Sequence, residues 1–330
     1  MCRGERQRAG RHVVRPQNPL SPAPWRDLTR FDSSDSTALG GVERRQQAMA
    51  PAGKSLDPKD LLMGGALQCA EGLSFGMPFE VWKTHMGMNR REGAMESFGN
   101  IYRRGGVGAF WKGWQPKMVE CFLKGGLLLF AKDGIIRASK TAGLSDVTAG
   151  VLGGFGGGCA QVVVLGPCTY LITAKVSEVK GEASVSMTQR MVQTWQSQGL
   201  AGFYRGGTAL MLRQGSNWAS RQGLTDASRA LIKSVNGGGG KLSVGEEFLA
   251  GTIGGGLSVW NQPFEVCRIV QQHASARGLP STTMMQTMSM IVKENGAMGL
   301  FQGAGPRAGL CVVQTLFMVT IPTLIKEYKA

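Results

Sequence analysis

Apolar residues in this chain lie in long segments that glycines and single polar residues repeatedly interrupt. No uninterrupted apolar run reaches the ~18 residues of a simple membrane span. The pattern predicts three pairs of long helices, each pair joined by a short helix. The first helices are expected near 58–90, 143–178 and 243–274, the short helices near 94–104, 186–198 and 281–294, and the second helices near 114–139, 207–233 and 304–328.

Two short sequence blocks recur in phase. The first block runs over Pro78–Lys83, Pro167–Ile172 and Pro263–Arg268, and the second over Gly106–Gly113, Gly199–Gly206 and Gly296–Gly303. The prolines are 89 and 96 residues apart, and the closing glycines are 93 and 97 residues apart. Two motifs that repeat together indicate three tandem repeats, at about 57–140, 141–235 and 241–330.

In these blocks the chain resembles the mitochondrial carrier family, whose repeats carry Pro-x-(Asp/Glu)-x-x-(Lys/Arg) followed by (Asp/Glu)-Gly-x4-aromatic-(Lys/Arg)-Gly. The resemblance covers residues 57–330. It implies an all-α membrane protein with six transmembrane helices in three pseudo-symmetric repeats around a central cavity, with short helices on the matrix side. It also implies a multi-pass monomer of the mitochondrial inner membrane that contacts anionic lipid, cardiolipin above all, and that uses no cofactor.

Three further strings narrow this resemblance: Arg213–Arg221, Trp260–Pro263 and Gln314–Val319. They are similar to the carboxylate-carrying branch of the family and, within it, to carriers of citrate and oxoglutarate. The resemblance therefore implies an antiporter that exchanges citrate for 2-oxoglutarate or related di- and tricarboxylates by alternating access. Tricarboxylate–malate exchange is the alternative within the family. Catalysis is not expected, because the three histidines are scattered and no nucleophile stands beside a base.

The net charge of the chain adds little to this interpretation of its function. The chain carries a net charge of +15, which suits nucleic acid, an anionic membrane surface or acidic small substrates. Nucleic-acid binding is the alternative from another class of function. The repeat region has no stripe of alternating aromatic and basic residues, so nucleic acid is not the expected partner. Seven cysteines without a Cys-x-x-Cys pair indicate reduced thiols and no metal site.

Residues 1–56 are predicted to be a disordered basic extension, since they are rich in Arg, Ser, Pro and Gln and lack apolar periodicity. The first 26 residues hold six arginines and one acid, as transit peptides do, although a plain basic tail fits the same composition.

Each first helix contains one proline of the first block: Pro78, Pro167 or Pro263. Proline removes a backbone hydrogen bond and clashes with the preceding turn, so we expect a kink in all three helices at one depth. Short glycine steps at Gly150/Gly154/Gly158 and Gly251/Gly255 are expected to let neighbouring helices approach closely.

The acid and base positions that follow these prolines form a predicted matrix gate, with the pairs Glu80/Lys83, Thr169/Ile172 and Glu265/Arg268. In the family, the acid of one repeat pairs with the base of the next and closes the matrix end. The resemblance therefore implies that Glu265 meets Lys83. The second repeat is degenerate, so Arg268 is expected to face only the hydroxyl of Thr169, and Glu80 to face Ile172. One ion pair between repeats, rather than three, would favour a fast exchanger.

Counting from each closing glycine puts Lys124, Arg213 and Arg307 on the inward face of the three second helices. Three cations that converge from three helices suit a ligand with two or three carboxylates, and arginine can grip a carboxylate bidentately. The alternative roles, which involve no substrate specificity, are a charge that merely lines the cavity for Lys124 and a helix cap for Arg307. The resemblance implies that the substrate-binding residues are Glu120, Lys124, Leu128, Arg213, Gln214 and Arg307, with Glu120 either orienting Lys124 or accepting a proton or hydroxyl hydrogen bond.

Overall fold

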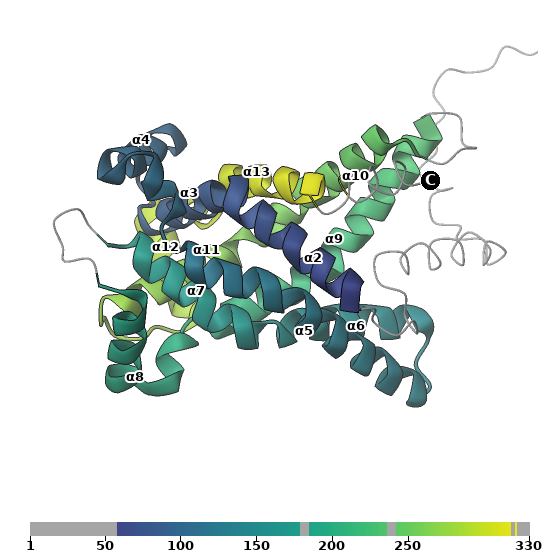
Figure 1. Cartoon of the computed structure of the whole chain (residues 1–330), viewed down its shortest axis with the longest axis horizontal. Coiled ribbons are helices and arrows are strands. Elements are labelled where there is room, and N and C mark those ends of the chain that lie inside the picture. The colour runs from purple at the N-terminus through teal and green to yellow at the C-terminus, as the bar shows by residue number, and fades with distance from the viewer. Residues whose placement is uncertain (1–57, 179–184, 236–241, 318–320, 322–330) are drawn as a thin grey trace, which may run out of the picture. The chain divides into compact units, whose positions relative to one another are not determined.

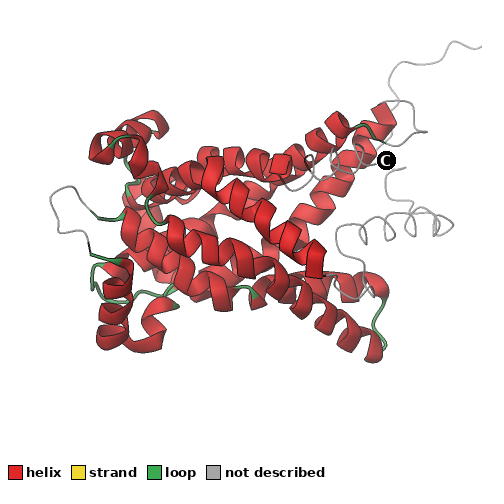
Figure 2. Cartoon of the chain, in the orientation of Figure 1, coloured by secondary structure: helices red, strands yellow, loops and turns green. Residues whose placement is uncertain are grey.

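A computed structural model describes residues 58–178, 185–235, 242–317 and 321. The predicted extension at 1–56 lies outside these residues. Every regular element in the described part is helical, and no strand occurs there (Figure 2). The predicted all-α class is therefore confirmed.

The element order recurs three times along the chain (Figure 1). The first group comprises α2 (Pro58–Glu71), the π-helical η2 (Gly72–Gly76), α3 (Met77–Met88), α4 (Ala94–Gly105), the 3-10 helix η3 (Val107–Trp111) and α5 (Trp114–Thr141). The second comprises α6 (Asp146–Ala160), α7 (Val162–Val176), α8 (Met187–Phe203) and α9 (Gly207–Val235). The third comprises α10 (Val244–Leu257), the 3-10 helix η4 (Ser258–Asn261), α11 (Gln262–Ala276), α12 (Met284–Asn295), the 3-10 helix η5 (Ala297–Phe301) and α13 (Ala304–Thr315).

Side-chain caps explain where several of these helices begin. The hydroxyl oxygens of Ser145, Ser186, Ser243 and Thr283 each accept a backbone N–H three residues further on, at the starts of α6, α8, α10 and α12. Such caps satisfy donors that the first turn leaves without partners. Local sequence thus fixes these starts to within a few residues of the predicted ones.

In each first helix the regular α-helix is interrupted before the proline rather than at it. Pro78 and Pro263 are the second residues of α3 and α11, directly after η2 and η4. In the second group, α6 and α7 meet at 43° near Gln161, and Pro167 lies within α7. Proline lacks the N–H that would bond to the carbonyl four residues earlier, so the distortion falls in the preceding turn.

Two motif aromatics satisfy carbonyls in these distorted turns. The hydroxyl of Tyr204 donates to the carbonyl of Val163 at 2.8 Å, which is the acceptor that Pro167 leaves unused. The indole of Trp111 likewise donates to the carbonyl of Leu73 at 2.6 Å. The aromatic of the second block therefore braces the bend of its own repeat in these two cases.

Replacing Tyr204 with phenylalanine is expected to lower the free energy of unfolding by about 1 kcal/mol, because the Val163 carbonyl loses its donor. A thermal unfolding midpoint in detergent measures this. Tyr102→Phe is the control, since the Tyr102 side chain is more than half exposed; an equal shift for both variants would contradict the brace.

The glycines of the second block adopt backbone conformations that other residues avoid. The opening glycines Gly106, Gly199 and Gly296 and the closing glycines Gly113, Gly206 and Gly303 all have φ between 62° and 84°. Positive φ strains residues that carry a Cβ. A chain reversal before each second helix is the reason why glycine recurs in this block.

The closing glycines also lie against a first helix from another group. A Cβ on Gly113 would lie 3.2 Å from the Cα of Ile172, one on Gly206 would lie 3.2 Å from the carbonyl of Arg268, and one on Gly303 would lie 3.0 Å from the carbonyl of Lys83. The first group thus contacts the second, the second the third, and the third the first. This cyclic order is what three repeats around an axis would produce; the ring arrangement itself stays a prediction.

Only some of the predicted glycine steps lie at close helix contacts. Gly251 and Gly255 pack on Thr315 and Cys311 of α13, and Gly158 packs on the backbone of Gln214 in α9. Gly150 and Gly154, in contrast, have no atom within 4 Å of an added Cβ. That part of the prediction is wrong, because the contact face of α6 toward α5 runs through neighbouring glycines instead.

Among the described residues, no single helix has both the length and the apolar character of a membrane span. One bent pair, Thr148–Ala160 with Val162–Val176, meets both criteria.

Candidate functional site

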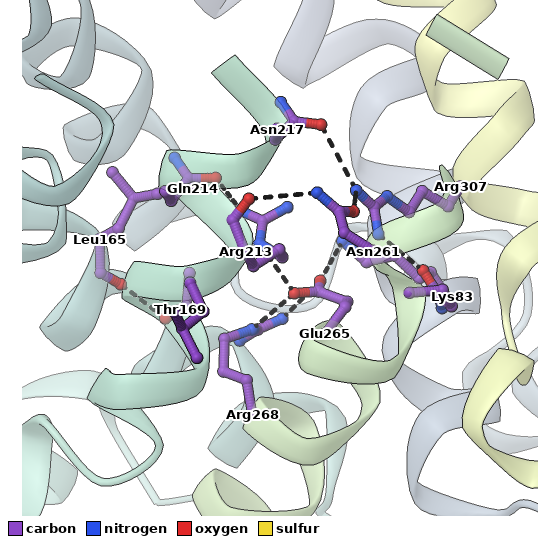
Figure 3. Close-up of polar contacts among 12 residues, drawn as sticks. Lys83, Leu165, Thr169, Arg213, Gln214, Asn217, Asn261, Glu265, Arg268 and Arg307 are labelled. Atoms are coloured by element: carbon purple, nitrogen blue, oxygen red, sulfur yellow. Dashed lines mark hydrogen bonds and ion pairs between the residues drawn. The ribbon is translucent and has the colours of Figure 1, made fainter. Parts of the chain in front are cut away.

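A buried carboxylate organises the region where α3, α9 and α11 meet. Glu265 is 0% exposed. One of its oxygens lies 2.8 Å from Lys83 Nζ and 2.8 Å from Arg268 Nη2, and the other lies 3.1 Å from Arg213 Nε (Figure 3). Three cations therefore surround one acid inside the protein. The contact expected between Glu265 and Lys83 is present, while its role as a gate stays a prediction.

A chain of alternating charges continues from Lys83 toward α5. Lys83 lies 2.8 Å from Glu80, and Glu80 lies 3.7 Å from Lys117. Lys117 in turn lies 2.9 Å from Glu120, which is 3.7 Å from Lys124. The side chain of Lys124 is 18% exposed, whereas the side chains of the other residues in this row of charges are less than 9% exposed. Lys124 is thus the accessible end of the charged row.

The second group contributes neutral contacts where the motif lacks its charges. The sequence predicted that Arg268 faces only the hydroxyl of Thr169, and this is wrong. Arg268 Nη1 donates to Gln272 Oε1 at 2.6 Å. The amide of Gln272 donates to Thr169 Oγ1 at 3.0 Å, and Thr173 donates to Gln272 Oε1 at 3.2 Å. Gln272 therefore replaces an ion pair between α7 and α11 by a hydrogen-bond bridge.

The expectation that Glu80 faces Ile172 is also corrected. Glu80 contacts Lys83 and Lys117, while Ile172 is 1% exposed and packs in an apolar cluster with Val81 and Val176. A buried carboxylate without a charged partner is costly, so Glu80 turns to the lysines. The interface between α3 and α7 is consequently apolar.

Arg307 differs from the other buried cations of the site because it has no carboxylate within ion-pair distance among the described residues. Its guanidinium donates to Gln262 Oε1 at 2.9 Å, to Asn261 Oδ1 and, at 3.5 Å, to Asn217 Oδ1 (Figure 3). Only 4% of the residue is exposed. These contacts are more than a helix cap requires. The positively charged guanidinium is bonded by neutral amide oxygens alone.

Asn261 connects Arg307 with Arg213. Its amide nitrogen donates to the carbonyl of Arg213 at 3.2 Å, while its oxygen accepts from Arg307. Arg213 also donates to Gln214 Oε1 at 2.5 Å, and its side chain is 16% exposed. The structure thus brings Arg213, Gln214 and Arg307 to one region, while their predicted role in substrate binding stays a prediction.

Gln161 links this group to Lys124. Its amide nitrogen donates to the carbonyl of Lys124, and its oxygen accepts from Gln214 and from the indole of Trp218, each at 2.9 Å. Gln161 stands at the bend between α6 and α7 and is 1% exposed. Sequence reasoning did not single out Gln161, although a glutamine at an otherwise apolar helix break is a usable signal.

Leu128 lies apart from these polar contacts. A Cβ on Gly157 would lie 3.1 Å from Leu128 Cδ1, so this side chain packs on α6. The predicted role of Leu128 in binding stays a prediction.

The chain matches the mitochondrial carrier protein family at residues 55–141 and 240–329. It is 33% identical to the citrate/oxoglutarate carrier protein of Saccharomyces cerevisiae over 84% of this chain and 92% of that protein. It is 28% identical to the mitochondrial substrate carrier family protein Z of Dictyostelium discoideum, over 76% and 85% of the two chains. Identity to the tricarboxylate transport protein of Saccharomyces cerevisiae is 26%, over 81% and 94%.

Proposed function

This chain belongs to the mitochondrial carrier family, and we propose that it exchanges citrate for 2-oxoglutarate, or related di- and tricarboxylates, across the mitochondrial inner membrane. The name of the yeast relative supports this choice of substrates. Members of the family are transporters and not enzymes.

The observation that carries the proposal is the bridge that Asn261 forms between α9 and α13: it accepts from the Arg307 guanidinium and donates to the backbone carbonyl of Arg213. Arg307 has only amide partners, so a substrate carboxylate could supply the charge that this cation lacks. Arg213 and Lys124 keep part of their side chains exposed, which leaves both able to meet a ligand. A molecule with carboxylates at both ends would then bridge α9 and α13, with a third carboxylate directed at Lys124.

The charges near this site support an anionic substrate. The cations are Lys83, Lys117, Lys124, Arg213, Arg268 and Arg307, and the acids are Glu71, Glu80, Glu120 and Glu265. Six cations against four acids leave an excess of two positive charges within this group of ten side chains. A dicarboxylate neutralises this excess, and the cost of desolvating the cluster falls when it does so.

Three different contacts hold α3, α7 and α11 together below this site. The α3–α11 contact is ionic, through Lys83 and Glu265; the α7–α11 contact is a neutral bridge, through Gln272; and the α3–α7 contact is apolar, through Val81 and Ile172. In the proposed alternating access, a bound carboxylate would compete with Glu265 for Arg213 and so loosen this end. One ionic contact of three keeps the barrier to opening low.

Thr169→Asp is expected to slow exchange about threefold to tenfold, because an acid beside Arg268 would add roughly 1 kcal/mol to the α7–α11 contact. Initial rates of exchange in proteoliposomes measure this. Thr169→Ser, which keeps the hydroxyl, is the control. Equal rates for both variants would discredit the role of this contact as a gate. Ile172→Lys, in contrast, would bury a charge in the apolar cluster and disturb folding.

Location in the membrane is supported by large apolar side chains that face outward on the long helices. Phe130 is 76% exposed, Phe75 64% and Val163 63%. Exposed aromatic and branched residues on several helices suit a lipid environment. We expect the six predicted spans to include the one bent pair that meets the length and apolar criteria.

Cardiolipin is the lipid partner that we propose, at a surface pocket of about 460 Å³ between α9 and α12. Arg205, the start of α9 at Gly207–Thr208 and the segment 281–285 line this pocket. Backbone N–H groups at helix starts and an arginine suit a phosphate headgroup. The proposed monomer would use this site without a partner chain.

Counter-exchange in proteoliposomes tests the function. Vesicles loaded with 2-oxoglutarate are expected to take up labelled citrate, and empty vesicles are not. If malate inside supports citrate uptake and 2-oxoglutarate does not, tricarboxylate–malate exchange, which the 26% identical relative favours, is the function instead.

A further inference from the structure

Glu71 is a buried acid that neither the sequence patterns nor the contacts above explain. It is the last residue of α2, directly before the π-helical η2, and is 2% exposed. A Cβ on Gly76 would lie 2.7 Å from Glu71 Oε1, so the carboxyl group folds back onto its own helix where no side chain stands. Short π-helical turns occur often at functional sites.

Glu71 is the one acid near the site without an ion pair in the described part of the chain. Glu80, Glu120 and Glu265 each lie within 2.9 Å of a lysine or arginine nitrogen. Glu71 Oε1 has no hydrogen-bond partner among the described residues; Glu120 Oε2 also lacks one, but Glu120 is ion-paired through Oε1. An unpaired carboxylate in such a place is costly, so this group accepts a proton more readily than its neighbours do.

The charged groups around Glu71 come from the elements packed against it. Those of α5 are Lys117, Glu120 and Lys124, and that of α3 is Glu80. Helix α13 packs on η2, and its one charged residue within Ala304–Thr315 is Arg307, which is held by amides. A Cβ on the next residue, Gly72, would lie 3.2 Å from Cys121 Sγ and 3.8 Å from Lys117 Cγ, so Glu71 stands beside the segment of α5 that carries Lys117 and Lys124. These two lysines are also the cations on the α5 side of the proposed substrate site.

A substrate carboxylate at Lys124 would therefore compete with Glu71. Two carboxylates that share one site cannot both stay ionised, and one of them takes up a proton. With Glu71 ionised, the cluster has an excess of two positive charges, which matches 2-oxoglutarate. With Glu71 protonated, the excess is three, which matches citrate.

We infer that Glu71 carries the proton that accompanies citrate, an inference that rests on the proposed function. As the third carboxylate of citrate approaches Lys124, Glu71 takes one proton from the same compartment, and both leave on the other side. No other bond forms or breaks. On the return step 2-oxoglutarate occupies the two arginines, and Glu71 is ionised beside the lysines. Citrate with its proton and 2-oxoglutarate then carry equal charge, so the exchange moves no net charge.

The test compares the wild type, Glu71→Gln and Glu294→Gln in proteoliposomes. Glu294 is an exposed acid of α12 that pairs with Arg90, away from the site. In the wild type and in Glu294→Gln, citrate uptake against 2-oxoglutarate is expected to rise up to about tenfold per unit of outside acidification, and a potassium–valinomycin potential is expected to leave it unchanged. In Glu71→Gln, the rise is expected to fall below about twofold per pH unit and the exchange to respond to the potential.

Two results would overturn the inference while leaving the proposed function intact: citrate exchange in the wild type that follows the potential, or an unchanged pH dependence in Glu71→Gln, which would place the proton on citrate itself. If Glu71→Gln lacks all transport, Glu71→Asp decides, because it must keep a pH dependence with a shifted midpoint; an unshifted midpoint overturns the inference. A wild type that carries neither citrate nor 2-oxoglutarate refutes the proposed function instead.

Discussion

Arg213→Lys is expected to lower the rate of citrate–oxoglutarate exchange by about one to two orders of magnitude. Arg213 donates to Gln214 and lies 3.1 Å from Glu265, with donors left over for a ligand. Lysine offers a point charge and cannot reproduce this fork. Losing charged hydrogen bonds worth about 1.5–3 kcal/mol accounts for the size of the effect.

The initial rate of labelled citrate uptake into vesicles loaded with 2-oxoglutarate measures this change. Arg190→Lys is the matched control, because Arg190 of α8 also pairs with a buried acid, Glu178, at 3.6 Å, yet stands outside the site. Wild-type citrate uptake in Arg213→Lys would be incompatible with the proposed binding site.

Glu265→Gln is expected to have the largest effect on stability, a loss of about 3–5 kcal/mol, because it leaves Lys83, Arg213 and Arg268 without their common acid. This corresponds to a fall in the unfolding midpoint on the order of 10 °C. Thermal unfolding in detergent, followed by exposure of the buried cysteines, gives the midpoint.

A second substitution separates charge from shape. Arg268→Met in the Glu265→Gln background removes a cation whose one acid within ion-pair distance in the described part of the chain is Glu265, and it is expected to restore part of the lost stability. Glu294→Gln, which breaks an exposed ion pair with Arg90, is expected to cost less than about 1 kcal/mol. Equal shifts for Glu265→Gln and Glu294→Gln would show that Glu265 does not organise the cluster.

The Glu265 cluster also suggests how binding and opening could be coupled in the proposed mechanism. Arg213 belongs to both the substrate site and the α3–α9–α11 cluster, since its Nε contacts Glu265. A ligand that draws Arg213 away weakens the attraction on Glu265 without breaking the Lys83 contact at once. The free energy of binding is thereby spent partly on loosening the closed end.

The sequence alone determined most of the helix starts, and together with the family resemblance it pointed to one contact between charged positions. The in-phase prolines and glycines predicted the bent and straight helices within a few residues, because proline and positive-φ glycine have local backbone requirements that no distant contact can override. The three-residue spacing of acid and base, read with the family resemblance, also pointed to the contact of Lys83 with Glu265.

Only the tertiary structure decided which neutral groups complete the site. Gln272 reaches Thr169 across 103 residues of sequence, and Asn261 reaches Arg307 across 46. An amide that accepts a hydrogen bond has no periodic pattern, and its partner depends on where two helices cross. The same holds for Glu71, whose Oε1 lies over Gly76 of the π-helical turn and has no hydrogen-bond partner in the described part of the chain. Burial makes these single contacts count, since an unpaired polar group inside the protein costs more than a paired one at its surface.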